Sequence, residues 1–407
     1  MSKHVVFLGP DLFSAYIEMV RGLKRAGARV TGIGHTSIQK LDPRLHRYLD
    51  AYEQTNTLDP TRVLEVCRRV AQKAPIDRLE TGDESLVLCA AQVREALELP
   101  GLTVRSATLC RDKPLMKEAL RQAGVPTAAS AAVDSLAALR EFVEREGFPV
   151  ILKPRSALGS LGTHRADNVA ELEKAAKALK LDQGMSVAVE EFVEGHEGFY
   201  DTLSIDGQVI HEFVSHYYPN VLPALADRRV SPQIAATNRV GLESYDELKD
   251  MGRKVIEVLG IGTSATHMEW FFGPKGLKFS EIGARPPGER IWDLYSAGND
   301  LNLWTEWAMI MVHGRQASHL SRRFATGSVQ IRPDRDGRIT GYDNVREVMR
   351  VLRPYLFEHR LPPRGTATDP IYKGYYNNVW FRLRHPDYDE LRKLLSFAGE
   401  RLKVRAA

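Results

Sequence analysis

Two glutamates in neighbouring apolar segments are the side chains of this sequence best placed for chemistry. Glu269 and Glu281 lie in the stretch 266–290, which is typical of two short strands joined by a tight turn. An unpaired carboxylate is costly to bury, and hard cations such as Mg²⁺ bind carboxylate oxygens together with substrate phosphates. Because Arg285 and a Pro-Pro-Gly bend follow, the pattern indicates a site for divalent cations and phosphate. Two exposed glutamates on a hairpin would give the same pattern.

The alternation of strand side chains assigns a neighbour to each carboxylate. We expect His267 to share a face with Glu269, and Phe279 to share a face with Glu281. His267 would then orient a carboxylate or assist the deprotonation of an amine, unless it is a structural histidine.

A lysine at the end of an apolar strand supplies positive charge. Lys153 lies near the end of FPVILKP (148–154) and precedes the small-residue loop RSALGSLGTH (155–164). The ammonium group can neutralise phosphate oxygens, and backbone N–H groups of the loop can close over them. No GK[ST] follows, so this is not a Walker loop. The alternative is a snorkelling lysine beside a surface turn.

The segment EEFVEGHE (190–197) places glutamates on both sides of an apolar pair. A strand of this kind can offer backbone groups to an adenine edge, and Glu197 in the turn could accept hydrogen bonds from ribose hydroxyls. A solvated strand and turn is the alternative.

The bulk composition limits the classes of protein. A chain of 407 residues predicts about two to four domains. A net charge of +4 does not suggest a nucleic-acid binder. No segment has the length of a signal peptide or a membrane span. Three cysteines without CxxC spacing predict a cytoplasmic protein.

Strands and helices alternate in the first hundred residues. Strands are predicted at 4–10 and 28–34, and helices at 14–27, 61–74 and 85–97. This alternation predicts a doubly wound parallel sheet. The GPDLF loop lacks GxGxxG, so residues 1–110 are expected to form a Rossmann-like domain without a dinucleotide fingerprint.

The rest of the chain predicts mixed structure. Strands are expected within 187–218, 326–332 and 376–383, and helices at 112–123, 136–146, 168–181, 244–259, 301–312 and 388–402. Ser244, with Glu247 three residues later, is the predicted cap of the helix 244–259.

Four segments then follow one another in a known order. They are DKPLMKEALRQAGVPT (112–127), GFPVILKPRSALGSLG (147–162), VEEFVEGHE (189–197) and ME…SEIGARPPG (268–288). Together they resemble the ATP-grasp superfamily over residues 110 to about 310. The flanking parts resemble those of its carboxylate–amine ligases and biotin-carboxylase-like members. The resemblance implies an α/β ATP-grasp fold: a Rossmann-like domain at 1–110, an ATP-grasp domain at 111–320 with a lid at about 125–188, and an α+β region at 321–407.

The resemblance also implies which residues bind ATP. Lys113 and Lys153 match the two lysines that touch ATP phosphates, and Glu197 matches the ribose-binding glutamate. Glu190, with the backbone of Phe192 and Val193, matches the adenine hinge. The loop that covers the phosphates matches 156–162, with Ser156, Gly159, Ser160 and Gly162 as its binding residues.

Metal and catalytic residues follow from the same resemblance. Glu269 and Glu281 match the Mg²⁺ ligands, with Mn²⁺ as the alternative metal, and Arg285 matches the arginine that holds the acyl phosphate or the transferred phosphoryl group. Arg285, Lys153 and His267 are the expected catalytic residues. Many members place Asn two residues after the second glutamate, whereas Gly283 stands here. The segment EIGARPPG resembles the variant in amino-acid and peptide ligases, where small residues are accepted. Which group completes the coordination of the second Mg²⁺ stays open.

The implied function is an ATP-dependent carboxylate–amine ligase. Phosphoryl transfer to a carboxylate gives an acyl phosphate, an amine displaces phosphate to form an amide or peptide bond, and ADP is released. Small-molecule carboxylates and amines, of the amino-acid class, are the expected substrates. No nucleic-acid or membrane partner is expected, and a homodimer is the assembly suggested by the resemblance.

Two rival functions stay open. One is a bicarbonate-using ligase like biotin carboxylase or the purine-pathway carboxylase, in which Glu289, four residues after Arg285, would activate bicarbonate. The other is an ATP-binding regulatory protein without turnover. The residues 216–218 are candidates for the acceptor pocket, or else aromatic anchors of a surface loop. Arg228 and Arg229 are candidates for binding a substrate carboxylate, or else solvated residues.

Overall fold

The computed structural model describes residues 2–155, 162–288, 290–370 and 378–407. The predicted phosphate-loop residues Ser156, Gly159 and Ser160, and also Glu289, lie outside this part of the chain. No described helix is long and apolar enough to span a membrane.

The N-terminal region contains a parallel sheet, as the sequence predicts. In the described part of this region four strands pair in the order β3 (Ala51–Gln54), β2 (Arg29–Gly34), β1 (His4–Leu8) and β4 (Arg78–Glu80). All five residues of β1 are buried, because a parallel strand is covered on both faces and reads as a continuous apolar run. The flanking helices are α1 (Tyr16–Arg25), α2 (Pro43–Tyr48), α3 (Pro60–Lys73), α4 (Val87–Ala96) and α5 (Val104–Arg111), with 3-10 turns η1 (Ile38–Lys40) and η2 (Glu84–Leu86).

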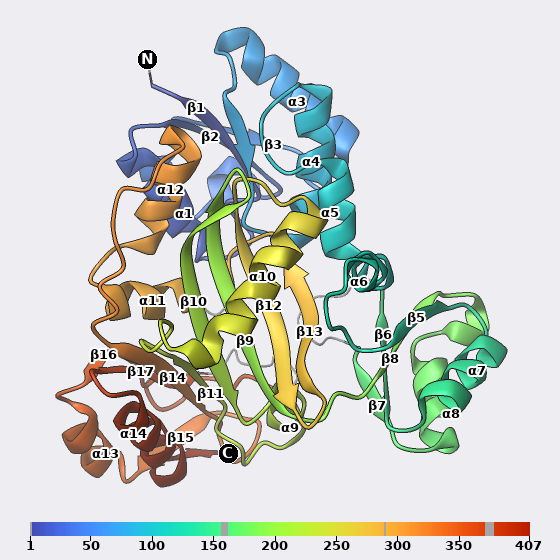
Figure 1. Cartoon of the computed structure of the whole chain (residues 1–407). Coiled ribbons are helices and arrows are strands. Elements are labelled where there is room, and N and C mark those ends of the chain that lie inside the picture. Colours follow the sequence, from blue (N-terminus) through green and yellow to red (C-terminus); the bar gives the residue numbers. More distant parts are fainter. Residues whose placement is uncertain (1, 156–161, 289, 371–377) are drawn as a thin grey trace.

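A long antiparallel sheet forms the centre of the molecule (Figure 1). Among the described residues it has eight strands, in the order β13 (Gly276–Gly283), β12 (Ser264–Gly273), β9 (His196–Ile205), β10 (Gln208–Tyr218), β11 (Gln233–Ala236), β14 (Ala325–Ile331), β17 (Val379–His385) and β16 (Leu356–Arg360). The strands β14, β17 and β16 belong to the C-terminal region, so the sheet crosses the boundary expected at residue 320. The domain boundaries themselves stay predictions.

Helices cover both faces of this sheet. On one face α10 (Asp246–Leu259) packs on Tyr200, Met268 and Trp270. On the other, α11 (Ile291–Asn299) and α12 (Leu303–His313) pack on β9 and β10, and α12 also contacts α1 of the N-terminal region. This contact is close: a Cβ on Gly22 of α1 would lie 2.5 Å from the carbonyl oxygen of Trp304.

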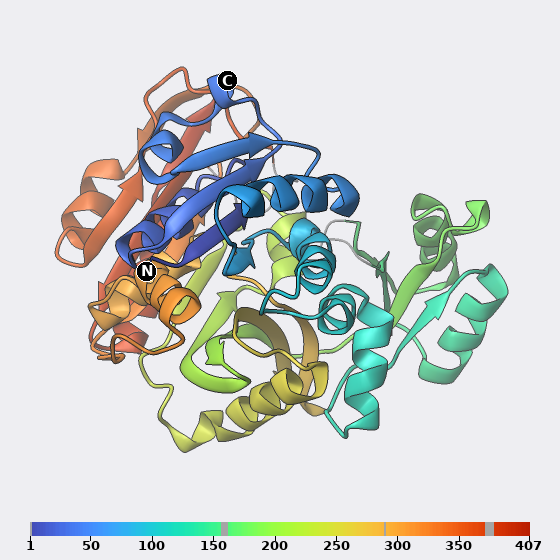
Figure 2. The same ribbon diagram turned by 90° about the horizontal axis from the view of Figure 1, so that it is seen from above.

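A small separate sheet forms the region that the sequence analysis predicts to be the lid. Within the described residues its order is β5 (Ser130–Val133), β8 (Val187–Glu191), β6 (Val150–Pro154) and β7 (His164–Ala166), covered by α7 (Leu136–Glu146) and α8 (Val169–Ala178). Seen from above, this unit stands apart from the body of the molecule, beside α6 (Lys113–Gln122) (Figure 2). The remaining elements are η3 (Leu181–Gln183), α9 (Val221–Ala226), η4 (Glu243–Tyr245), β15 (Ile339–Asp343), α13 (Val345–Leu352), α14 (Tyr388–Arg401) and β18 (Lys403–Ala406).

The predicted cap of α10 is wrong. Ser244 lies inside the 3-10 turn η4, and the residue before the helix is Tyr245, whose side chain makes no capping hydrogen bond. The turn feeds directly into the helix, and Asp246 and Glu247 place negative charge at the helix start instead.

Candidate active site

The two glutamates of the hairpin face one another across paired strands. Glu269 of β12 and Glu281 of β13 are direct partners, whereas the next pair is Trp270 with Phe279. Ser280 is therefore an extra residue, a β-bulge that resets the alternation of side chains. As a result Phe279 packs with the fully buried side chains beneath α10, on the face opposite Glu281. The expectation that Phe279 and Glu281 share a face is wrong for this reason.

Two lysines from different elements lie close to one of these carboxylates, Glu281. Lys113, at the start of α6, lies 3.2 Å from Glu281, and Lys153, near the end of β6, lies 4.0 Å from the same carboxylate. Although burial opposes it, the ammonium groups of Lys113 and Lys153 lower the pKa of Glu281 to about 2. Burial alone would lower the pKa of Lys153, yet the charges of Glu190 and Glu281 raise it.

A third lysine, which the sequence analysis did not single out, completes this cluster. The Nζ atoms of Lys117 and Lys153 lie 2.8 and 2.9 Å from the same oxygen, Oε2 of Glu190. Lys117 is 1% exposed, and burial, which outweighs the attraction of Glu190, lowers its pKa to about 8. The signal was present, because Lys117 follows Lys113 by four residues on one helix face. Oε1 of Glu190 is buried and has no hydrogen-bond partner among the described residues.

Glu197 lies on the same side of the sheet as Glu269 and Glu281, and two hydrogen bonds with Asn220 and Val221 fix it. The N–H of Val221 donates to its Oε2 at 2.7 Å, and its own N–H donates to Oδ1 of Asn220 at 3.0 Å. Burial, followed by the charge of Glu269, raises the pKa of Glu197 to about 8. Glu197 therefore belongs to the same acidic cluster as the hairpin glutamates.

His267 shares a face with Glu269, as predicted, at 3.8 Å. Its Nδ1 lies 2.7 Å from Asp201 of β9, which also accepts a hydrogen bond from Tyr295 at 2.5 Å. Burial opposes protonation, but the carboxylate of Asp201 raises the pKa of His267 to about 9. The imidazole is thus cationic at neutral pH, which favours orienting a carboxylate over deprotonating an amine. Asp201 was missed, although strand alternation places it on the face of Glu197.

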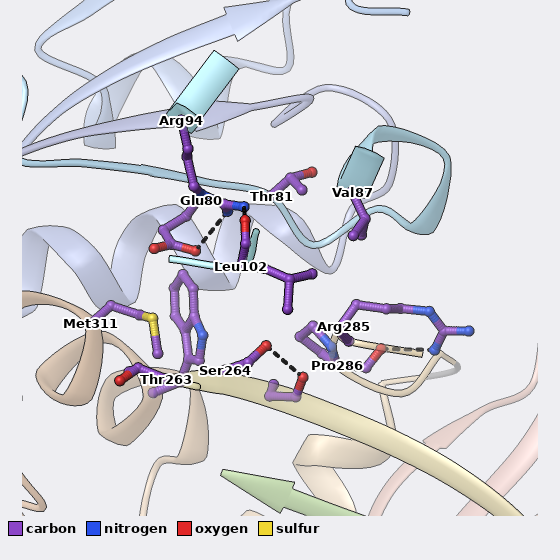
Figure 3. A pocket seen from close by; sticks show the side chains of 13 residues that line it. Glu80, Thr81, Val87, Arg94, Leu102, Thr263, Ser264, Arg285, Pro286 and Met311 are labelled. Atoms are coloured by element: carbon purple, nitrogen blue, oxygen red, sulfur yellow. Dashed lines mark hydrogen bonds and ion pairs between the residues drawn. The ribbon is translucent and has the colours of Figure 1, made fainter. Parts of the chain in front are cut away.

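Arg285 lies just after β13 and contacts the N-terminal region. Its Nε donates to Glu84 at 2.7 Å and its Nη1 to the carbonyl of Pro286 at 2.9 Å. It also lines a pocket between the N-terminal region and the start of β12 (Figure 3). The other wall of this pocket includes Glu80 and Arg94, which form an ion pair of 3.4 Å. The space left between the lining side chains suits a solvent molecule rather than an amino acid.

Other predicted residues lie elsewhere or are already engaged. His216 and Tyr218 point to the face of β10 opposite Glu197, where His216 contacts His196 at 2.9 Å. Arg228 pairs with Asp336, and Arg229 with Asp227. In the segment predicted to be the adenine hinge, the N–H of Phe192 donates to the carbonyl of Pro149 at 3.1 Å. Among the described residues no group of three or more His, Cys, Asp or Glu side chains could hold a metal ion.

Comparison with known proteins places these residues in a family context. Residues 112–211 match the family model described as "Carbamoyl-phosphate synthase L chain, ATP binding domain". The L-arginine-specific L-amino acid ligase of Bacillus subtilis is 24% identical over 269 residues, which are 64% of each chain. The alanine–anticapsin ligase of Bacillus subtilis (strain 168) is 28% identical over 232 residues, 51% of this chain and 48% of the relative. The chain thus spans about half to two-thirds of the length of these two curated relatives.

A solved structure covers the whole chain. The crystal structure of L-amino acid ligase from Bacillus licheniformis superposes with a TM-score of 0.80 at 19% identity, over 100% of this chain and 99% of that one. This likeness and the family match confirm the predicted fold: the chain has the ATP-grasp fold, with a parallel sheet in its N-terminal region.

Proposed function

We propose that this ATP-grasp protein is an ATP-dependent carboxylate–amine ligase that forms an amide or peptide bond and releases ADP and phosphate. One observation carries the proposal: Lys113 and Lys153, from separate elements, converge on Glu281, the strand partner of Glu269 in the β12–β13 hairpin. The ligase names of the relatives support the same reaction class, with amino acids as the expected substrates.

The residues present fit ATP and a divalent cation. The facing carboxylates of Glu269 and Glu281 would hold Mg²⁺ or Mn²⁺. The orphaned Oε1 of Glu190 offers a buried acceptor to an N–H donor such as an adenine amino group, and Glu197 offers one to a ribose hydroxyl. Bound ATP supplies the phosphoryl group that activates the carboxylate as an acyl phosphate, while the cation screens phosphate charge.

The side chains of the protein act by position and charge. Lys113 and Lys153 neutralise phosphate oxygens, and Arg285 holds the group being transferred. The cationic imidazole of His267, fixed by Asp201, orients a carboxylate beside Glu269. Gly162 ends the predicted phosphate loop with a φ of +71°. We propose that the loop excludes water from the reactive intermediate.

A bicarbonate-using ligase is the second candidate. The family model that matches residues 112–211 describes the ATP-binding domain of carbamoyl-phosphate synthase, which favours keeping this alternative. A homodimer and a cytoplasmic location remain part of the proposal.

Product analysis separates the candidates. The protein is incubated with Mg-ATP and pools of amino acids, with and without bicarbonate, and ADP, AMP and phosphate are measured. ADP release that requires a pair of amino acids supports the proposal, and release that requires bicarbonate alone supports the second candidate. AMP as the product contradicts an acyl-phosphate route.

A variant tests the metal ligands within the same assay. Glu281→Gln should lose at least about 100-fold in turnover, because it removes one of two charged cation ligands. Glu247→Gln, an exposed glutamate of α10, is the matched control. Full turnover by Glu281→Gln would show that Glu281 is not a ligand of the catalytic cation.

A further inference from the structure

Glu84 of the N-terminal region reaches into the site built by the hairpin. It begins the 3-10 turn η2, directly after β4 and its loop. The side chain of Asp83 caps this turn by accepting from the N–H of Ser85 at 2.9 Å, and Tyr16 donates to the same carboxylate at 3.1 Å. The backbone that carries Glu84 is therefore held from two sides.

The carboxylate of Glu84 bridges two guanidinium groups. Its Oε2 accepts from Nε of Arg285 at 2.7 Å, and its Oε1 lies 3.2 Å from Nη1 of Arg111 on α5. The side chains of Glu84 and Arg285 are 14% and 19% exposed. A charge-assisted contact with this little exposure fixes a guanidinium more strongly than a surface ion pair does.

The absence of a side chain at position 283 makes this contact sterically feasible. A Cβ on Gly283 would lie 2.9 Å from Oε2 of Glu84 and 3.4 Å from Cγ of Arg285. Gly283 is buried and pairs with His267 across the hairpin, two residues after Glu281. The carboxylate of a distant segment thus fills the space in which a side chain at 283 would lie.

We propose that Glu84 is the positioning residue of Arg285, and that position 283 is glycine because the Glu84 carboxylate needs its space. Nε of Arg285 donates to Glu84, and Nη1 donates to the Pro286 carbonyl. Figure 3 draws the contact of Arg285 with Pro286. Among the described residues Nη2 has no hydrogen-bond partner, so it is left for a ligand. This inference rests on the proposed function, in which Arg285 holds the transferred group.

Kinetics of four variants test the proposal: Glu84→Gln, Glu84→Ala, Gly283→Ala and the double variant Glu84→Ala/Gly283→Ala. Loss of orientation at the reacting group costs about 10- to 100-fold in rate. We therefore expect kcat to fall about tenfold in Glu84→Gln and about 100-fold in Glu84→Ala, while the KM for ATP changes less than about twofold. Gly283→Ala should lower kcat as Glu84→Ala does, and the double variant should show no further loss.

The thermal midpoint provides a readout independent of turnover. Gly283→Ala should lower it by about 2–4 °C in the wild-type background, where the new Cβ meets the carboxylate, and less in Glu84→Ala. Glu65→Gln, an exposed glutamate of α3, is the control.

The outcomes are distinct. A wild-type protein that releases no ADP overturns the proposed function and, with it, the role of Arg285. An active wild type with unchanged kcat in Glu84→Ala overturns this inference alone. Equal and additive effects of Gly283→Ala in both backgrounds also overturn it, because the two positions would then be independent.

Discussion

The carboxylate of Glu190 holds two buried ammonium groups, so replacing it by glutamine should destabilise the protein strongly. Lys117 and Lys153 lie 2.8 and 2.9 Å from one of its oxygens. At an effective dielectric constant of about 20, each pair contributes roughly 6 kcal/mol of Coulomb energy. Glu190→Gln also removes the desolvation cost of a buried carboxylate, so the expected net loss is about 3–5 kcal/mol.

Proton release by Lys117 limits this loss. Its pKa is already lowered to about 8 with Glu190 in place. Without the carboxylate the pKa should fall further, so that Lys117 becomes neutral near pH 7 and no longer remains a buried, unpaired charge. The destabilisation of Glu190→Gln should therefore be larger at pH 6 than at pH 8.

Denaturant unfolding followed by tryptophan fluorescence measures the effect. Glu194→Gln, an exposed glutamate of the same segment, should change the free energy of unfolding by less than about 0.5 kcal/mol. Lys117→Met should cost less than Glu190→Gln, because Lys153 still pairs with the carboxylate. A loss below about 1 kcal/mol in Glu190→Gln, at every pH tested, would refute the reasoning that this carboxylate neutralises the cluster.

Three further predictions concern other parts of the chain. Gly252→Ala in α10 should destabilise the protein by about 1–3 kcal/mol, against the usual helix preference for Ala, because its Cβ would lie 2.4 Å from the ring of Tyr200; thermal unfolding measures this. Burial and the neighbouring His196 lower the pKa of His216 to about 3. The unfolded state therefore takes up a proton first as the pH falls below about 6.5, and His216 should contribute a drop in stability of about 1.3 kcal/mol between pH 7 and 5.5. His216→Gln should reduce the acid loss by this amount, and the part that remains belongs to His196, whose pKa burial also lowers. Lys153→Met should raise the KM for ATP at least about tenfold in steady-state kinetics, since it removes a charge-assisted phosphate contact.

Each of these three predictions has a control variant or a contradicting outcome. Gly241→Ala, where a Cβ meets nothing within 4 Å, should be nearly neutral, and a stabilised Gly252→Ala would show that Tyr200 moves freely. A loss of stability between pH 7 and 5.5 that is undiminished in His216→Gln would assign the proton uptake to another group. Lys180→Met, outside the cluster, should leave the KM for ATP unchanged, and an unchanged KM in Lys153→Met would remove that lysine from the phosphate site.

Local patterns predicted the elements better than the contacts between them. The apolar run of β1 and the periodicity of α1 and α3 gave the parallel sheet and its helices, because burial on both faces leaves a readable pattern. The order of the motifs gave the positions of Lys113, Lys153 and the hairpin glutamates. Lys117 was readable from its spacing to Lys113, and Asp201 from its spacing to Glu197.

Two features had no local signal. The bulge at Ser280 depends on how β13 pairs with β12, and a single extra residue moves Phe279 to the face opposite Glu281. Glu84 lies about 200 residues before Arg285, and their contact exists only because the N-terminal region packs on the hairpin. The roles of these residues in catalysis stay predictions until the variants are measured.

The continuation of the central sheet past residue 320 determines where this protein can be truncated without loss of solubility. The four residues of β11 are buried and pair with β14, from Gln233 with Val329 to Ala236 with Thr326. A fragment that ends at residue 320 would expose an unpaired apolar edge, to which other copies could add strands. We therefore expect such a fragment to aggregate. A soluble ATP-binding fragment must retain the C-terminal strands, or carry charged residues along the edge of β11.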